Sequence, residues 1–311
     1  MHFDSKFWAL IIGGSSGFGL AAARKLAAHG MNICIVHRDR RAAMRSIQES
    51  FGEIAASGAG LLTYNLDALT VEGRRHVLDG LREAMGGEGR VRLLLHAVAF
   101  GNLKLLAPWA LKNPGRAARE QLYEKTGISN EEVRAAIRNG LDKGLDALAS
   151  LDDPPCYNER QFLDAGDFAR TIHAMGTNIV EWVGDVFSRG LFAGDARVLS
   201  LTSEGNSIAW RGYAAVSAAK AALESVTRAM AVEYAPHGIR ANVIQAGVTD
   251  TAAMRAIPGS QQIKSRARLR NPMARLTTPE DVADVIFLLC LKEAAWINGA
   301  LLCVDGGERI A

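Results

Sequence analysis

The amino-acid sequence predicts an α/β fold in which a doubly wound parallel sheet forms a single domain over the 311 residues. Two observations predict this fold. Short apolar runs alternate with segments of helical periodicity and are joined by short turns, which is the pattern of successive βαβ units. A glycine-rich turn, Gly13 to Gly19, also stands between the first apolar run and the first helix. With 49% hydrophobic residues, the chain can bury a substantial core.

The composition argues against several other classes of protein. The net charge of +3 does not indicate general nucleic-acid binding, and no apolar run reaches the roughly 18 residues of a membrane span. The four cysteines (Cys34, Cys156, Cys290 and Cys303) form no CxxC pair, so we expect neither a metal site nor a disulfide framework. Because the glycine-rich turn begins by residue 13, we expect no signal peptide and a soluble, cytoplasmic protein.

The first unit of the chain predicts a phosphate-binding turn. An apolar strand at residues 7–12 precedes the turn, and a helix at residues 20–27 follows it. Glycines let the backbone approach a pyrophosphate, while the helix N-terminus supplies free N–H groups and the positive end of a dipole. The residues of the turn that we expect to bind a nucleotide are Gly13, Ser15, Ser16, Gly17, Phe18 and Gly19.

The second apolar run, residues 31–36, ends in a basic turn that predicts the cofactor. In a dinucleotide fold, an acidic residue at this point binds the 2′-hydroxyl of NAD, whereas an arginine accommodates the 2′-phosphate of NADP. His37 stands where the acid would be, and Arg38 follows it. We therefore expect NADPH, with a solvated basic turn as the alternative.

The alternation continues along the chain, with one interruption. Further strands are expected at residues 61–66, 91–100, 197–201, 239–244 and 300–304, and helices at residues 71–85, 167–189, 213–234 and from Thr278 onward. No buried strand occurs from about residue 102 to residue 161. A short helix at residues 116–125, and a second one that opens at the capping box Ser129-x-x-Glu132 and runs to Leu148, predict an inserted helical hairpin. The hairpin either packs against a subunit or covers the active site as a lid.

Several motifs make the chain resemble the short-chain dehydrogenases/reductases. They are Gly13-x-x-x-Gly17-x-Gly19, Ser203, Tyr213, Lys220, the stretch from Asn242 to Thr251, and Val304-Asp305-Gly306-Gly307. The resemblance covers nearly everything except the insertion. It implies a Rossmann-type fold, a nicotinamide cofactor, and Tyr213, Lys220 and Ser203 as catalytic residues, although Ser203 could equally stabilise its turn.

The departures from the common pattern resemble the NADPH-dependent enoyl-acyl-carrier-protein reductases of fatty-acid synthesis. Tyr213 lies seven residues before Lys220, and Val216 stands where the common members carry the tyrosine. His96 and Phe100 form a His-x-x-x-Phe motif after the fourth strand, and Ala246-Gly247 replaces Pro-Gly. We interpret His96 itself as a satisfied structural histidine at the end of a buried strand.

The resemblance also implies further contacts with the cofactor and the substrate. Additional cofactor contacts are expected from Asn65, Leu66, Ala97, Lys220, Gly247, Val248, Thr249 and Thr251. Substrate contacts are expected from Phe100, Met254 and Ile257, of which the last two suit a lipid tail.

The displaced tyrosine favours reduction of a carbon–carbon double bond. Positions four and seven before Lys220 share one stripe of a helix, so the tyrosine still faces the cofactor while its base moves by about 4.5 Å. A ketone reductase delivers hydride to the carbon that bears the oxygen. An enoyl reductase delivers it two bonds away, while charge builds on the thioester oxygen. Two alternatives stay open: another short-chain reductase acting on a carbonyl or a specialised-metabolite enone, and a non-catalytic NADP-binding regulator.

The expected partners are an acyl carrier protein or coenzyme A thioester and further copies of this chain, with no nucleic acid and no membrane. Residues 261–275 are expected to be weakly structured and carry Lys264, Arg266, Arg268 and Arg270, which form either a rim for an acidic carrier or a solvated basic loop. Members of the resembled family usually form homotetramers through the helices at residues 167–189 and 213–234, and we expect the same here.

Overall fold

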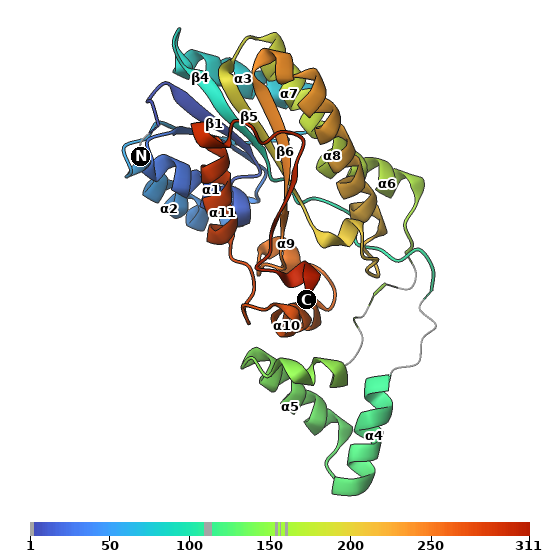
Figure 1. Cartoon of the computed structure of the whole chain (residues 1–311). Coiled ribbons are helices and arrows are strands. Elements are labelled where there is room, and N and C mark those ends of the chain that lie inside the picture. The colour runs from blue at the N-terminus through green and yellow to red at the C-terminus, as the bar shows by residue number, and fades with distance from the viewer. Residues whose placement is uncertain (1–2, 109–113, 153–154, 156, 159–160) are drawn as a thin grey trace.

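The computed structural model describes residues 3–108, 114–152, 155, 157–158 and 161–311. At its centre is a seven-stranded sheet with parallel pairing throughout, in the order β3-β2-β1-β4-β5-β6-β7 (Figure 1). The strands are β1 (Phe7–Ile12), β2 (Asn32–His37), β3 (Leu61–Asn65), β4 (Arg90–His96), β5 (Phe192–Thr202), β6 (Ile239–Ala246) and β7 (Leu301–Val304). The order reverses between β1 and β4, where open α/β sheets bind ligands beyond the carboxyl ends of their strands. The doubly wound parallel fold is confirmed.

Helices cover both faces of the sheet, because alternate residues of each strand point to opposite sides. On one face, Ile11 packs in a core with α1 (Gly17–Ala28), α2 (Met44–Ala55) and α11 (Pro279–Cys290). On the other face, Leu10 packs with α3 (Val71–Met85), α7 (Asn178–Ser188) and α8 (Ala214–Glu233). None of the helices in the part of the chain that the structure describes is long and apolar enough to cross a membrane.

Most elements lie where the sequence predicts them, with two differences in the first half of the chain. β4 ends at His96 and does not continue to Phe100, because the backbone leaves the sheet there and borders the cavities described below. The helix α2 was not predicted, although Ile47, Phe51 and Ile54 recur at helical spacing and are buried.

The helix expected at residues 167–189 is divided into three parts. α6 (Ala165–Ile172) begins earlier, at a capping box in which Asp164 and Asp167 exchange hydrogen bonds. A π-helical turn, η3 (His173–Thr177), follows before α7 begins. Such turns occur frequently at functional sites, and this one directs Met175 into a cavity.

The insertion forms a helical hairpin beyond the carboxyl edge of the sheet, next to α10 (Figure 1). It contains α4 (Pro114–Thr126), α5 (Asn130–Asp142) and η2 (Asp146–Leu151). The predicted capping box at Ser129 and Glu132 is confirmed, but the prediction that α5 reaches Leu148 is wrong. Gly144 takes a φ of +84°, which ends the helix and lets η2 fold back, so that Leu148 lies over Gly140. Cys156 lies outside the described residues.

The basic segment at residues 261–275 is more regular than predicted. It contains α10 (Ser260–Arg270), which follows the short helix α9 (Ala252–Arg255). Ion pairs anchor α10, because Lys264 contacts Asp250 and Arg268 contacts Asp146. Sequence periodicity could not reveal these partners, since they lie in other parts of the chain.

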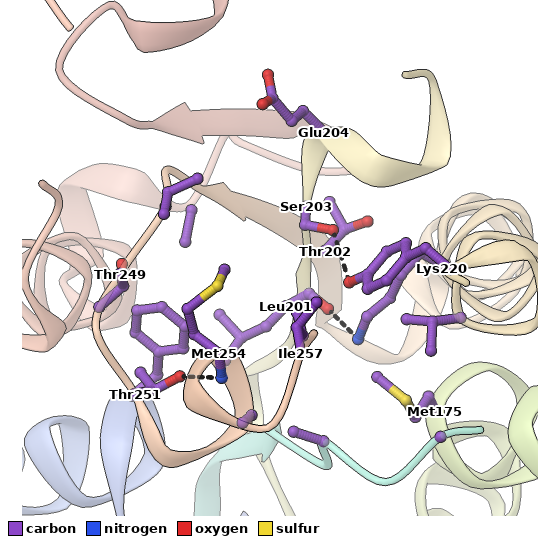
Figure 2. Close-up of a pocket in the computed structure, with 18 of the residues that line it drawn as sticks. Met175, Leu201, Thr202, Ser203, Glu204, Lys220, Thr249, Thr251, Met254 and Ile257 are labelled. Atoms are coloured by element: carbon purple, nitrogen blue, oxygen red, sulfur yellow. Dashed lines mark hydrogen bonds between the residues drawn. The ribbon is translucent and has the colours of Figure 1, made fainter. Parts of the chain in front are cut away.

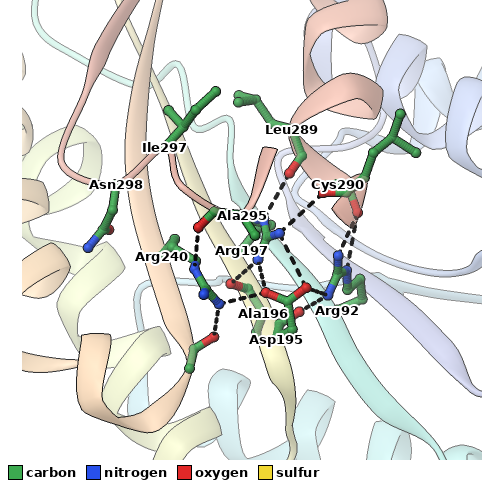
Figure 3. A network of polar contacts seen from close by, with 12 residues as sticks. Arg92, Asp195, Ala196, Arg197, Arg240, Leu289, Cys290, Ala295, Ile297 and Asn298 are labelled. Atoms are coloured by element: carbon green, nitrogen blue, oxygen red, sulfur yellow. Dashed lines mark hydrogen bonds and ion pairs between the residues drawn. The ribbon is translucent and has the colours of Figure 1, made fainter. Parts of the chain in front are cut away.

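Three arginines converge on Asp195 near the amino ends of the central strands, away from the carboxyl ends (Figure 3). They are Arg92 from β4, Arg197 from β5 and Arg240 from β6. Arg92 and Arg197 also donate to the carbonyl oxygens of Cys290 and Leu289, at the end of α11. These cations therefore stabilise the negative end of the α11 dipole as well as the carboxylate.

Candidate active site

The glycine-rich turn between β1 and α1 leaves the first turn of α1 free to accept an anion. Gly13 has a φ of +93°, and a Cβ there would lie 2.6 Å from the carbonyl oxygen of Ala97, so the turn packs closely against the end of β4. Ser16 is the N-cap of α1 but makes no capping hydrogen bond with its side chain, and the first turn contains no acidic residue. Free N–H groups and an uncompensated dipole fit the pyrophosphate of a dinucleotide.

A cavity of about 470 Å³, which we call the nucleotide cavity, extends from this turn. Of the residues that the sequence predicts for the cofactor, those lining it are Gly13, Ser15, Ser16, Gly17, Phe18, Gly19, His37, Arg38, Leu66, Ala97 and Thr251. Asn65 does not line the cavity. Its side chain instead accepts from the backbone N–H of Asp39 at 3.0 Å and donates to the carbonyl of Asp39 at 3.1 Å, which fixes the turn after β2.

Two carboxylates that the sequence reasoning missed border the nucleotide cavity at this turn. Arg38 donates to Asp67 at 2.7 Å, and the buried ring of His37 contacts Asp39 at 2.9 Å through Nδ1. The Arg38 guanidinium also lies 4.7 Å from the centre of the Phe100 ring. Phe100, predicted as a substrate contact, therefore lies beside Arg38 on the nucleotide cavity.

A second cavity of about 240 Å³, the reaction cavity (Figure 2), shares lining residues with the nucleotide cavity. The predicted catalytic residues Ser203, Tyr213 and Lys220 line it, as do Gly247, Val248, Thr249, Thr251, Met254 and Ile257. Ser203 Oγ lies 3.3 Å from the Tyr213 hydroxyl. Tyr213 is the N-cap residue of α8, and Lys220 lies two turns further along that helix and donates to the carbonyl of Leu201 at 2.8 Å.

Burial sets the protonation of the two central groups. It raises the pKa of the Tyr213 phenol, and the hydrogen bond with Ser203 only partly opposes this change. Burial also lowers the pKa of Lys220 to about 8, against the opposing charge of Glu224. At neutral pH, Tyr213 is therefore a hydrogen-bond donor and Lys220 is mostly cationic.

Glu224 holds the turn that carries Ser203, a role that the sequence did not indicate. It lies one turn after Lys220 on α8 and accepts hydrogen bonds from Thr202 Oγ1, at 2.7 Å, and from the side-chain amide of Asn206. These two donors flank Ser203 in the sequence. Glu224 thus fixes the turn on both sides of the serine.

His96 is buried at the end of β4, as predicted, but the expectation of a satisfied histidine is wrong. Among the residues that the structure describes, neither ring nitrogen has a hydrogen-bond partner. Burial, together with the nearby charge of Lys220, lowers the pKa of His96 to about 3. The ring is neutral at physiological pH and is therefore not a general acid there.

The residues that line the reaction cavity outside the predicted site set include Met175, Trp210 and Val216. Val216 is buried and lies one turn from Tyr213 on the same side of α8. Helical spacing from Lys220 would have found Val216, whereas Met175 depends on the π-helical turn.

Comparisons with known proteins agree with this geometry. The model of the short chain dehydrogenase family matches residues 7–108, and that of the enoyl-(acyl carrier protein) reductase family matches residues 158–308. The two matches leave residues 109–157 uncovered, which is the part of the chain that holds the hairpin.

Individual relatives are named for different reactions. Cis-4-hydroxycyclohexanecarboxylate dehydrogenase of Sinomonas cyclohexanicum is 29% identical over 64% of this chain and 79% of its own length. A probable 2,4-dienoyl-CoA reductase of Bacillus subtilis is 25% identical over 96% of this chain and 95% of its own length. The crystal structure of FabI from Candidatus Liberibacter asiaticus has the same fold, with a TM-score of 0.71, 18% identity and coverage of 98% of this chain and 95% of the other. The chain belongs to the short-chain dehydrogenase/reductase family of oxidoreductases.

Proposed function

We propose that this chain uses NADPH to reduce the trans-2 double bond of an enoyl thioester, the reaction of an enoyl-acyl-carrier-protein reductase in fatty-acid synthesis. The observation that carries the proposal is the position of the phenol. Tyr213 lies seven residues before Lys220 and bonds to Ser203, while apolar Val216 occupies the position four before Lys220 in the same cavity.

The positions of the two residues favour a substrate whose oxygen lies away from the carbon that is reduced. Tyr213 and Val216 are three residues apart, which corresponds to about 4.5 Å along a helix. In an enoyl thioester, the β-carbon that receives hydride is separated by two bonds from the carbonyl carbon. A donor displaced along the helix therefore suits the thioester oxygen, and Val216 packs against the apolar chain.

Each polar group of the reaction cavity has a role in this proposal. A bound nicotinamide supplies the hydride. Tyr213 donates a hydrogen bond to the thioester oxygen as negative charge builds there, and Ser203 orients the phenol. Lys220 uses one N–H on Leu201, which leaves two for the nicotinamide ribose hydroxyls. Its positive charge favours the phenol as a donor.

The preference for NADPH rests on the turn after β2. Arg38 borders the nucleotide cavity, where its guanidinium can bind a 2′-phosphate. His37 occupies the position at which an NAD-binding fold carries an acidic residue. Asp67 already pairs with Arg38, so the phosphate must share or displace that contact. The thioester carrier is an acyl carrier protein or coenzyme A.

A second candidate is oxidation of an alcohol or reduction of a ketone. The contact between Ser203 and Tyr213 would place two hydroxyl groups on one substrate oxygen, an arrangement that also suits a carbonyl. The Sinomonas relative is named for a reaction of this kind, whereas the Bacillus relative is named for reduction of a conjugated thioester. A non-catalytic regulator is disfavoured, because binding of NADP alone requires neither Tyr213 nor Lys220.

NADPH oxidation separates these functions. We expect consumption with crotonyl-CoA and much slower consumption with acetoacetyl-CoA. Tyr213→Phe should lower turnover of crotonyl-CoA by roughly 10²-fold while NADPH affinity stays nearly unchanged. Tyr234→Phe, at the far end of α8, is the matched control. Faster reduction of the ketone would support the second candidate, and no consumption with either substrate would support a binding role.

A further inference from the structure

Three cavities follow one another along the carboxyl edge of the sheet. The nucleotide and reaction cavities share lining residues, among them Phe18 and Thr251. The reaction cavity in turn shares Trp210, Tyr213 and Ile257 with a third cavity of about 770 Å³, which we call the outer cavity. The nucleotide and outer cavities have no lining residue in common among the described residues. A ligand whose reacting atoms contact Tyr213 can therefore extend into the outer cavity.

The insertion supplies one wall of the outer cavity. Ser150 and Tyr157 line it from the insertion, Ile263 and Arg266 from α10, and Trp210 from the segment before α8. Neither family match covers residues 109–157, so this wall lies outside the regions that the two family models match.

Specific contacts fix the insertion beside α10. Arg268 binds both carboxylate oxygens of Asp146, at 2.8 and 2.6 Å, and this contact lowers the pKa of Asp146. Gln261 donates to Asp142 at 2.8 Å, and the Tyr157 hydroxyl donates to the carbonyl of Arg211 at 2.7 Å. The outer cavity is therefore bounded by elements that are bonded to one another.

The size and lining of the outer cavity fit a long ligand of mixed polarity. Protein ligand pockets commonly enclose roughly 300–1,000 Å³, so the reaction cavity alone is small for a whole thioester. In the outer cavity, Ser150 and Gln262 offer polar groups, while Trp210, Pro258 and Ile263 offer apolar surface. A phosphopantetheine arm combines amide groups, a branched apolar segment and a terminal phosphate.

Arg266 is an exposed cation on the wall of the outer cavity. It makes no hydrogen bond or ion pair with any described residue. Arg270, in contrast, pairs with both Glu204 and Glu308, so its single positive charge offsets part of the charge of these two carboxylates. Asp152 accepts a hydrogen bond from Gln262.

We propose that the outer cavity binds the phosphopantetheine arm of the thioester substrate, with Arg266 at its phosphate. The identity of the reacting acyl group rests on the proposed function, but binding of the arm is measured without any reaction. Coenzyme A and an acyl carrier protein both contain this arm, and the test separates them.

Calorimetric titration of the whole protein with 4′-phosphopantetheine and with pantetheine tests the phosphate contact. The phosphorylated compound should bind roughly three- to tenfold more tightly to the wild type, and Arg266→Ala should abolish the difference. Arg138→Ala, an exposed arginine of α5 outside all three cavities, is the matched control and should retain it. Equal binding of both compounds by the wild type, or an unchanged preference in Arg266→Ala, would overturn the proposal.

A second variant tests whether the arm lies in the outer cavity. Ser150→Trp should fill the outer cavity, weaken phosphopantetheine binding at least tenfold and leave NADPH binding unchanged, because the two cavities share no lining residue. If Ser150→Trp binds phosphopantetheine like the wild type, the arm lies elsewhere.

Steady-state kinetics show whether the arm belongs to coenzyme A or to an acyl carrier protein. They also distinguish failure of the binding proposal from failure of the proposed function. Arg266→Ala should raise KM for a crotonyl thioester of coenzyme A, of an acyl carrier protein, or of both, and leave crotonyl-N-acetylcysteamine, which lacks the phosphate, unaffected. The carrier that shows the effect is the source. Equal changes with N-acetylcysteamine would overturn the assignment of Arg266. Binding of phosphopantetheine without enoyl reduction would refute the proposed function alone.

Discussion

At the scale of single residues, Arg38 is expected to set the cofactor preference. Its guanidinium already contacts Asp67 and the Phe100 ring, so it is held at the edge of the nucleotide cavity. Arg38→Ala should lower kcat/KM for NADPH by roughly tenfold and change kcat/KM for NADH little, because only NADPH carries the 2′-phosphate. A wild-type preference for NADH would contradict this assignment.

The lowered pKa of Lys220 predicts how activity depends on pH. Burial lowers its pKa from 10.5 to about 8, so the side chain loses its charge as the pH rises through about 8. Tyr213 keeps its proton in that range, because burial raises the pKa of the phenol above its ordinary value of 10.0. We therefore expect kcat/KM to fall on the alkaline side, which a pH–rate profile with crotonyl-CoA measures.

Lys220→Arg tests whether Lys220 causes this alkaline fall, because an arginine keeps its charge throughout the range. The variant should lose activity overall but show no fall near pH 8. A fall at the same pH in the variant would assign the titration to another group.

The resemblance to the short-chain dehydrogenases/reductases identified Ser203, Tyr213 and Lys220 as site candidates, and the structure brings them into one cavity because the turn after β5 faces the start of α8. The partners of these residues could not be predicted in the same way. Glu224 contacts the turn around Ser203 only because of tertiary packing, and Asp67 reaches Arg38 from a different βα unit.

At the scale of elements, the predictions succeeded where local physics decides. The capping box at Ser129 marks the beginning of α5 as expected. The helix expected from Thr278 onward is α11, and the structure shows a capping box there as well. The predictions failed where contacts with distant parts of the chain determine the secondary structure. α10 is stabilised by Asp146 and Asp250, which lie outside it, and its sequence alone reads as a solvated basic loop.

The arginine cluster around Asp195 predicts acid sensitivity of the end of α11. Burial opposes ionisation of Asp195, but hydrogen bonds from Arg197 and Arg92 and their charges outweigh it, so its pKa lies below its ordinary value. The stabilisation is complete above the pKa of the unfolded chain and is lost as the pH falls through the lower pKa of the folded protein.

Asp195→Asn should therefore lower the free energy of unfolding at pH 7 by roughly 2 kcal/mol. This value is smaller than that for a fully buried ion pair, because the Asp195 carboxylate is partly exposed. Denaturant unfolding at pH 7 and at about pH 3 measures the effect, and the difference between wild type and variant should shrink at the lower pH. Asp79→Asn, in an exposed ion pair with Arg189, is the control and should change stability little. A pH-independent difference for Asp195→Asn would assign the loss to packing.

At the scale of the whole molecule, the resemblance predicts the sheet and many of the residues that line the nucleotide and reaction cavities, but it does not predict the outer cavity. The inserted hairpin was foreseen as either a packing element or a lid. The structure places it against α10, where it walls the outer cavity. This placement depends on pairs such as Asp146 and Arg268, which lie far apart in the sequence, so no local pattern could reveal it.

The exposed face of α8 suits an interface between copies of this chain. The outer face of α8 exposes small residues, Ala221, Ser225 and Ala229, one turn apart, and exposed Val232 continues the row. Small side chains allow two helices to approach closely, and this helix is one of those through which the resembled family forms tetramers. We therefore expect this chain to form a homotetramer, which sedimentation at micromolar concentration would detect. Ser225→Arg should dissociate it while NADPH binding persists, because Ser225 lines neither the nucleotide nor the reaction cavity. Ser46→Arg, on the exposed face of α2, should leave the assembly intact. A wild type that sediments as a monomer, or a Ser225→Arg variant that stays tetrameric, would place the interface elsewhere or remove it.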